Sequence, residues 1–236
     1  SEATTVTGTP QLALNLGGIT KQANYASGSG STALVFTYTI AAGDTDANGI
    51  AIAANALTLN GGTLKDAAGN SATITHAAVT DNAGYLVDTT APLAPVINAV
   101  ATDDIVNSAE QTSVITGTNE SGATVALSIG GNTRAATVSG TTWSYTLTAA
   151  DITAMGEGAE TLSATQTDAA GNVSVAGTRA ISVDTAGPTV SSVAITSATG
   201  AQNSTLNVGD VVTVTVTMSE ATTVTGTPQL ALNLGG

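Results

Sequence analysis

The same eighteen residues, SEATTVTGTPQLALNLGG, stand at positions 1–18 and again at positions 219–236. Identity over such a length indicates a duplicated unit, and the two copies begin 219 − 1 = 218 residues apart. A repeat of this kind predicts a tandem array of similar modules. We therefore expect the chain to be one window of a longer array, with both ends inside a module rather than between modules.

The composition favours β-structure built from aliphatic and β-branched residues. Hydrophobic residues make up 42% of the 236, but only 3% of the chain is aromatic and 9% is charged. Residues such as Val, Ile and Thr fit half-buried, pleated surfaces. Turn-forming residues, among them 26 glycines, separate them into short runs. This pattern is typical of an all-β sandwich or barrel.

The charge and the missing cysteines exclude several classes of function. The net charge is −13, and the four basic residues are scattered, so the chain lacks the basic surface that nucleic acids need. Without cysteine there is neither a disulfide nor a thiolate metal site. No apolar run reaches the ~20 residues that span a bilayer. An excess of carboxylates either keeps a chain soluble by self-repulsion or collects cations.

Two similar stretches divide the chain, VDTTAP at 87–92 and VDTAGP at 183–188. Their aspartates lie 184 − 88 = 96 residues apart, a natural length for a seven-stranded sandwich. In the run 141–148, Trp143, Tyr145 and Leu147 alternate with polar residues and share one face. We expect a complete immunoglobulin-like (Ig-like) sandwich over 91–187, with strands within 94–100, 112–118, 123–129, 133–138, 141–148, 160–167 and 172–183.

The flanking segments are predicted to be two parts of a second kind of Ig-like module. Residues 1–90 would lack its first strands, and residues 188–236 would supply the first strands of the next repeat. Three runs predict strands with one apolar face, and the first of them alternates strictly: Val212, Val214, Val216 and Met218; Leu12, Leu14 and Leu16; Leu34, Phe36, Tyr38 and Ile40. An uncovered sheet edge recruits another chain. The expected partners are therefore neighbouring repeats, or copies of the chain itself arranged head-to-tail.

The stretches DDIVNSAE, ITGTNESGATVALSIGG, TTWSYTL, ATQTDAAGNVS and ISVDTAGP follow one another between the two aspartates. In this order they resemble the bacterial Ig-like tandem repeats of giant surface adhesins of the RTX type, which are exported by type I secretion. The flanking stretches VTGTPQLALNLGG, LVFTYTIAAGDTDANGI and LKDAAGNSA resemble a second Ig-like module of such arrays. The resemblance implies an Ig-like fold, an extracellular or cell-surface location and Ca2+ at the domain junctions. It identifies no ligand.

Carboxylates far apart in the sequence are expected to converge at the two poles of the central sandwich, because its loops alternate between its ends. Calcium takes about six to eight oxygen ligands from carboxylates, amide side chains and carbonyls. The alternative is that these residues only form turns and keep the surface polar. The expected ligands are Asp103, Asp104, Asn107, Glu110 and Asp184 at one pole, and Asp88, Glu120 and Asp168 at the other.

A further candidate metal site is the stretch GDTDANGI. Asp44, Asp46 and Asn48 alternate before Gly49, as in the first half of a Ca2+-binding loop. Asn55 occupies the position where such a loop needs a bidentate acid, so an EF-hand is not expected. Either a weaker site closed by other loops or a plain polar turn would account for this stretch.

The sequence gives little support for catalysis. His76 is the only histidine and is expected to be an ordinary strand residue. Neither a nucleophile elbow nor a phosphate-binding glycine loop is present. Asp151, Glu157 and Glu160 could form a carboxylate pair, but no aromatic platform lies near them in the sequence, so a solvated loop is expected over 149–160.

These inferences predict a structural extender repeat of a bacterial cell-surface adhesin or extracellular fibre, stiffened by Ca2+ at its junctions. Two alternatives stay open. One is a fibre subunit that assembles head-to-tail through its open ends. The other is an Ig-like module that binds a glycan or protein ligand.

Overall fold

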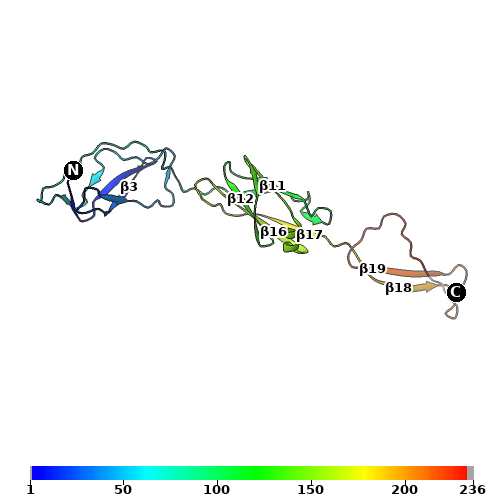
Figure 1. The fold of residues 1–236 in the computed structure, drawn as a ribbon. Coiled ribbons are helices and arrows are strands. Elements are labelled where there is room, and N and C mark those ends of the chain that lie inside the picture. The colour runs from blue at the N-terminus through cyan, green and yellow to red at the C-terminus, as the bar shows by residue number, and fades with distance from the viewer. Residues whose placement is uncertain (1, 233–236) are drawn as a thin grey trace.

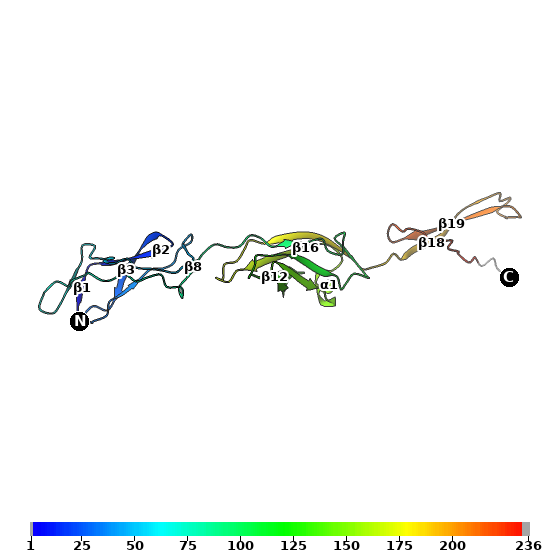
Figure 2. The same cartoon turned by 90° about the horizontal axis from the view of Figure 1, so that it is seen from above.

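The computed structural model describes residues 2–232, so the last four residues of the second repeated segment lie outside the described part of the chain. Three groups of strands follow one another along a line, with the N-terminus and the C-terminus at opposite ends (Figures 1 and 2). Hydrogen-bonded strands pair only within each group. We call the groups the head (residues 2–88), the central sandwich (residues 94–184) and the tail hairpin (residues 190–218).

The central sandwich consists of two sheets that lie face to face. Its architecture confirms the predicted all-β sandwich. The five-stranded sheet has the order β10(Ile105–Asn107), β17(Gly177–Asp184), β16(Gly158–Thr167), β12(Thr124–Ile129) and β13(Asn132–Ala135). The four-stranded sheet has the order β14(Thr137–Ser139), β15(Thr142–Thr146), β11(Val114–Thr118) and β9(Val96–Ile97).

The core of the sandwich comes from strict alternation along its strands. In β12, Val125, Leu127 and Ile129 are buried, while the residues between them are only partly covered. Trp143, only 2% exposed, lies opposite Gly117 in the β11–β15 pair. A Cβ atom at Gly117 would come within 2.5 Å of the indole ring, so only glycine lets the ring pack this closely. The single tryptophan of the chain is therefore a core residue.

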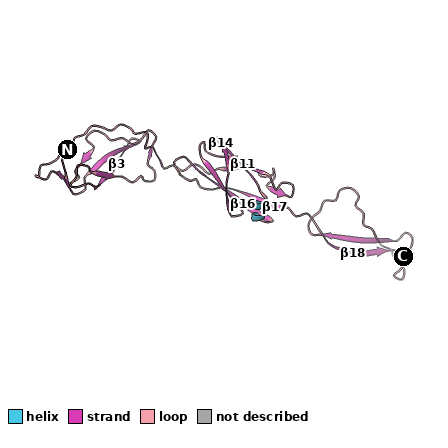
Figure 3. Ribbon diagram, in the orientation of Figure 1, coloured by secondary structure: helices cyan, strands magenta, loops and turns pink. Residues whose placement is uncertain are grey.

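Three local predictions for this region were wrong. Strand β10 lies in a segment expected to be a loop, and it pairs in parallel with β17. The run expected as one strand over 133–138 divides at Ala136 into β13 and β14, which belong to different sheets. The expected loop 149–160 contains helix α1(Ala149–Met155) and the first residues of β16 (Figure 3). No helix within residues 2–232 has the length and apolar character needed to span a membrane.

The head contains one sheet with two chemically different faces. Its order is β4(Val35–Thr37), β3(Ile19–Ser27), β2(Gln11–Leu16) and β6(Leu57–Thr58). The β2–β3 register places Leu12, Leu14 and Leu16 on one face, but only Leu16 is fully buried. Two shorter pairs complete the head, β1(Thr5–Thr7) with β7(Thr63–Lys65) and β5(Thr45–Asp46) with β8(Val87–Asp88). His76 lies outside the strands and accepts a hydrogen bond from the Ala56 N–H at Nε2 (2.9 Å).

The tail hairpin consists of β18(Val190–Thr199) and β19(Val211–Met218). Residues 219–232 follow it without forming a strand, although their sequence is the same as that of residues 1–14. In the head this sequence forms β1 and most of β2, which pair with β3, β6 and β7. The tail contains no counterpart of these partners among its described residues. Pairing therefore decides whether this sequence becomes a strand.

Candidate functional site

The first candidate site lies where the head meets the linker that leads to the central sandwich. The pairing of β5 with β8 places Thr45 opposite Asp88. A hollow of about 650 Å³ opens beside this pair, and Asp46, Asn48 and Asp88 line it together with Gly17 and Leu86. The structure thus brings Asp88 together with two residues that the sequence assigned to a different site.

The Asp46 carboxylate is already bound by main-chain donors. The Gly17 N–H donates to Oδ2 (2.8 Å), and the N–H groups of Asn48 (3.2 Å) and Gly49 (2.8 Å) donate to Oδ1. These bonds, that from Gly17 above all, lower the pKa of Asp46 despite its burial. The ionised Asp46 carboxylate therefore stabilises the turn by accepting hydrogen bonds from its main-chain N–H groups.

Asp44 is not among the residues that line this hollow, and it pairs with a lysine. Lys21 Nζ lies 2.6 Å from Oδ1, while the Tyr38 hydroxyl (2.7 Å) and the Ala41 N–H (2.8 Å) donate to Oδ2. The bond from Lys21, followed by those from Ala41 and Tyr38, lowers the pKa of Asp44 to about 2. Although Asp44 and Asp46 are only two positions apart, their carboxylates thus bind different donors: Asp44 binds mainly side chains and Asp46 binds main-chain N–H groups.

On the other side of the linker, side-chain amides of the central sandwich hold the linker backbone. Asn172 Nδ2 donates both to the Asp88 carbonyl (3.2 Å) and to Asp168 Oδ2 (2.9 Å). The bond from Asn172 also lowers the pKa of Asp168. Buried Gln166 donates from Nε2 to the Leu93 carbonyl (2.6 Å) and accepts the Glu120 N–H at Oε1 (2.7 Å). Asn172 thus links the Asp88 main chain to the Asp168 carboxylate, while Gln166 links the Glu120 main chain to Leu93.

Sequence reasoning missed Gln166 as a linker contact. A polar residue in the alternating run of β16, at a position whose neighbours on the same face are apolar, is the signal that could have found it. A buried amide needs partners for both its oxygen and its nitrogen. Here the linker and the Glu120 main chain supply them.

The second candidate site lies at the other pole, where the chain leaves the sandwich towards the tail hairpin. The parallel β10–β17 pair places Asn107 opposite Asp184. Both residues line a hollow of about 270 Å³ together with linker residues 185–188 and Glu220. Glu220 belongs to the second repeated segment and was not among the predicted ligands. Nearby, the Glu157 carboxylate accepts hydrogen bonds from the Thr185 N–H (2.9 Å) and hydroxyl, and these bonds lower its pKa.

The remaining carboxylates predicted at this pole form hydrogen bonds or ion pairs that hold the segment between β9 and β11. The Arg179 guanidinium binds both oxygens of Asp104, at 2.6 Å and 2.5 Å. This contact, with a weaker one from the Val100 N–H, lowers the pKa of Asp104 to about 2. Asp103 accepts the Ile105 N–H (3.0 Å), and Glu110 accepts the Asn107 N–H (3.3 Å). All three carboxylates therefore have protein partners.

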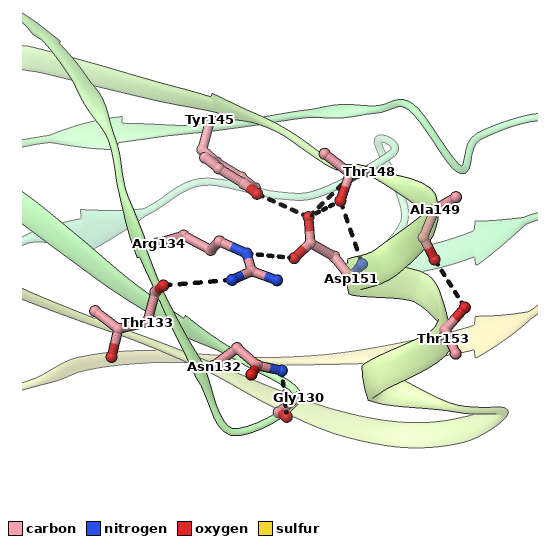
Figure 4. Close-up of polar contacts among 9 residues, drawn as sticks. All are labelled: Gly130, Asn132, Thr133, Arg134, Tyr145, Thr148, Ala149, Asp151 and Thr153. Atoms are coloured by element: carbon pink, nitrogen blue, oxygen red, sulfur yellow. Dashed lines mark hydrogen bonds and ion pairs between the residues drawn. The ribbon is translucent and has the colours of Figure 1, made fainter.

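A third cluster surrounds Asp151, which was expected in a solvated loop but is fully buried (Figure 4). Its carboxylate accepts bonds from Arg134 Nε (2.7 Å), the Tyr145 hydroxyl (2.8 Å) and both the N–H (3.0 Å) and the hydroxyl (2.7 Å) of Thr148. Burial favours the neutral acid, but the bonds from Thr148, Tyr145 and Arg134 together outweigh it and lower the pKa of Asp151. Thr148 and Asp151 also form a capping box at the start of α1.

Some of the carboxylate and amide oxygens described above suit a calcium ion, and others do not. Within residues 2–232, no three His, Asp or Glu side chains gather closely enough to hold a metal ion. Asp44 and Asp104 do not fit, because each already pairs with a cationic side chain. Asp184 and Glu220 do fit in donor chemistry, because both are carboxylate residues that line one hollow. Asn107 lines the same hollow, and its Oδ1 accepts the Ala109 N–H (2.9 Å).

Fold and site together define a series of β-modules joined by linkers that the modules' own side chains hold. No protein-family model matches the chain, nor does any curated protein. Solved structures do match it, among them a bacterial immunoglobulin-like domain from the M. primoryensis ice-binding adhesin. That match has 31% identity, covers 40% of this chain and 100% of the other, and has a TM-score of 0.31.

Two longer structures also match. One is a Ca2+-stabilized adhesin that helps an Antarctic bacterium reach out and bind ice (25% identity, 84% of this chain and 48% of the other, TM-score 0.41). The other concerns host cell surface retention of a 1.5-MDa bacterial ice-binding adhesin (22% identity, 83% of this chain and 63% of the other, TM-score 0.34). The chain is thus similar to bacterial Ig-like adhesin domains, as the resemblance in its sequence implied.

Proposed function

We propose that the chain is a structural extender of a bacterial cell-surface adhesin, in which modules in series carry a binding region away from the cell. One observation carries this proposal: the chain enters the central sandwich at one pole and leaves it at the other, so that each module adds length (Figure 1). A strand adds about 3.3 Å per residue along its direction. The module's function is then mechanical, and its location is extracellular.

Stiffness at the first linker comes from the contacts of Gln166 and Asn172 with the linker carbonyls of Leu93 and Asp88. Bending there would break hydrogen bonds of a buried amide, which costs more than breaking bonds exposed to water. At the second linker, the Glu157–Thr185 contact and the bond from the Thr189 N–H to Ser219 Oγ (2.9 Å) also hold the chain, but both are exposed to water and so resist bending less. These linkers differ from flexible Gly/Ser linkers, which behave as random coils.

Calcium is proposed to stiffen the second linker further. Asp184 and Glu220 would supply carboxylate oxygens and Asn107 an amide oxygen, while a bound Ca2+ would offset the repulsion between the two carboxylates. The high negative charge of the chain would favour cation binding. One of the matched adhesins is described as Ca2+-stabilized, and the proposal extends this property to the present chain.

Small-angle scattering of the whole chain, with Ca2+ and with a chelator, tests this proposal. We expect an extended particle in both conditions and a larger maximum dimension with Ca2+. The double variant Asp184→Asn/Glu220→Gln should lose the response to Ca2+. The matched control Asp103→Asn/Glu2→Gln should keep it, because Glu2 occupies the position equivalent to Glu220 in the first repeated segment. Equal dimensions with and without Ca2+ would exclude the calcium step, and a compact particle would exclude the extender.

A further inference from the structure

Two segments of the head run alongside each other outside its named strands, and the only histidine of the chain joins them. We call residues 50–56 the first segment and residues 76–85 the second segment. Main-chain hydrogen bonds connect the two segments. At one end of this pairing the Asn55 N–H donates to the His76 carbonyl (3.2 Å), while Asn55 Oδ1 accepts the His76 N–H (3.2 Å). The His76 side chain therefore lies where the second segment begins to follow the first.

The contacts of the His76 ring define its protonation state. The Ala56 N–H donates to Nε2 (2.9 Å), and Nδ1 lies 2.7 Å from the Ala77 carbonyl oxygen. A main-chain N–H can only donate and a carbonyl oxygen can only accept, so Nε2 carries no proton and Nδ1 carries one. The ring that makes both contacts is therefore neutral, with its proton on Nδ1.

A second proton on the ring is incompatible with one of these two contacts. Protonation of Nε2 converts this nitrogen from an acceptor into a donor, which then faces the N–H donor of Ala56. The contact of Nδ1 with the Ala77 carbonyl is unaffected, because Nδ1 donates in both states. Ala56 is buried, and a buried N–H that loses its acceptor lowers stability by more than an exposed one. Protonation of His76 therefore disfavours the closed pairing of the two segments.

No neighbouring carboxylate offsets the positive charge of a protonated ring. The first segment, residues 67–80 apart from His76, and strand β2 beside Ala56 contain no titratable side chain. None of the ion pairs among residues 2–232 includes His76. Asp81, the carboxylate nearest to it in the sequence, accepts a hydrogen bond from the Asn48 side chain (2.5 Å). The balance between the closed and open pairing thus depends on the ring itself.

We propose that His76 is a pH-sensitive switch, which holds the two segments of the head together when its ring is neutral and releases them when the ring takes up a proton. Histidine changes its charge between about pH 8 and pH 5. Because the closed form binds one proton fewer than the open form, the contact is favoured at the higher pH and is lost as the pH falls. The central sandwich contains no histidine and should not respond in this range. This inference does not depend on the extender function or on calcium.

Nitrogen NMR of the whole natural chain tests the state of the ring, because its only imidazole gives one pair of signals. At pH ~7.5 the ring should carry its proton on Nδ1, and at pH ~5 both nitrogens should be protonated. A proton on Nε2 at the higher pH would refute the proposal, since that nitrogen could not then accept the Ala56 N–H.

Hydrogen exchange measures the release of the two segments. After correction for the intrinsic effect of pH, protection of the Ala56 amide should fall about tenfold between pH ~7.5 and pH ~5, while β12 and β16 should not change. His76→Ala should show the low protection at both pH values, and His76→Gln, which stays neutral, should show no response to pH. The matched control Thr75→Ala, at the exposed neighbouring position, should respond as the natural chain does. Equal protection of Ala56 at both pH values in the natural chain, or a response that persists in His76→Gln, would overturn the proposal.

Discussion

Asp104 and Arg179 are 75 positions apart in the sequence and form a two-pronged ion pair, with Nε 2.6 Å from Oδ1 and Nη2 2.5 Å from Oδ2. The pair fixes the loop after β9 to strand β17. The pKa of Asp104 is about 2 in the folded chain and ~3.9 in an unfolded one. The pair therefore stabilises the fold above pH ~4, and this contribution is lost as the pH falls towards 2.

The first prediction concerns this acid dependence. In urea unfolding followed by Trp143 fluorescence, Asp104→Asn should lower the midpoint at pH 6 and flatten its fall between pH 4 and pH 2. Asp103→Asn is the control, because its carboxylate accepts one main-chain bond and has no cationic partner in the structure. An unchanged pH profile in Asp104→Asn would show that the pair does not contribute.

The second prediction concerns Asp151. Replacement by Ala removes four hydrogen bonds and leaves Arg134 without its anion. The free energy of unfolding should fall by about 3 kcal/mol, the range expected when a buried ion pair loses one partner. Thr153→Ala in the same helix removes one exposed contact with the Ala149 carbonyl and should cost less than about 0.5 kcal/mol. Chemical denaturation of the two variants side by side measures both. A loss below about 1 kcal/mol for Asp151→Ala would contradict the role given to this cluster.

The third prediction concerns the first linker. Gln166→Leu keeps a side chain of similar volume but removes the bonds to the Leu93 carbonyl and the Glu120 N–H. Main-chain amides of residues 89–96 should then exchange hydrogen faster, and the distribution of distances across the linker should broaden. Asn98→Ala, which removes an exposed contact with Thr116, should leave the linker unchanged. Unaltered exchange in Gln166→Leu would mean that other contacts hold the linker.

The fourth prediction uses the repeated segment as its own control. Leu12 and Leu230 occupy equivalent positions, but Leu12 pairs within the head sheet and Leu230 is 50% exposed outside any strand. Leu12→Ala should destabilise the head by about 1–2 kcal/mol, less than a fully buried leucine would cost. Leu230→Ala should be nearly neutral at concentrations where the chain is monomeric. Calorimetry that found the same loss for both would show that the tail copy is also folded.

The strands of the central sandwich were largely predictable, because their apolar residues alternate and turn residues separate them. Strand β10 was not, since three residues in a stretch rich in Asp and Asn give no alternation to detect. Only their parallel pairing with β17 makes them a strand. Helix α1 did have a signal that was overlooked, namely Thr148 followed by Asp151 three positions later, the spacing of a capping box.

The partners of the carboxylates were the least predictable feature. Each of the three ion pairs among the described residues joins one cationic side chain to one carboxylate. Lys21 pairs with Asp44, Arg134 with Asp151 and Arg179 with Asp104. These partners lie between 17 and 75 positions away, so strand register decides which acid meets which base. The placement of loops at the two poles could be argued from the alternation of a sandwich. Which oxygens remain available to a cation depends on contacts that only the structure reveals.

The chain leaves the central sandwich along β17, which is hydrogen-bonded on both sides. It pairs with β16 over seven positions and with β10 over three. A pull at the two linkers would act along this strand and load its bonds together, in shear, so they could not open one after another. A hairpin pulled at its two free strand ends, by contrast, unzips. The terminal strand therefore gives the module resistance to tension applied through its two linkers.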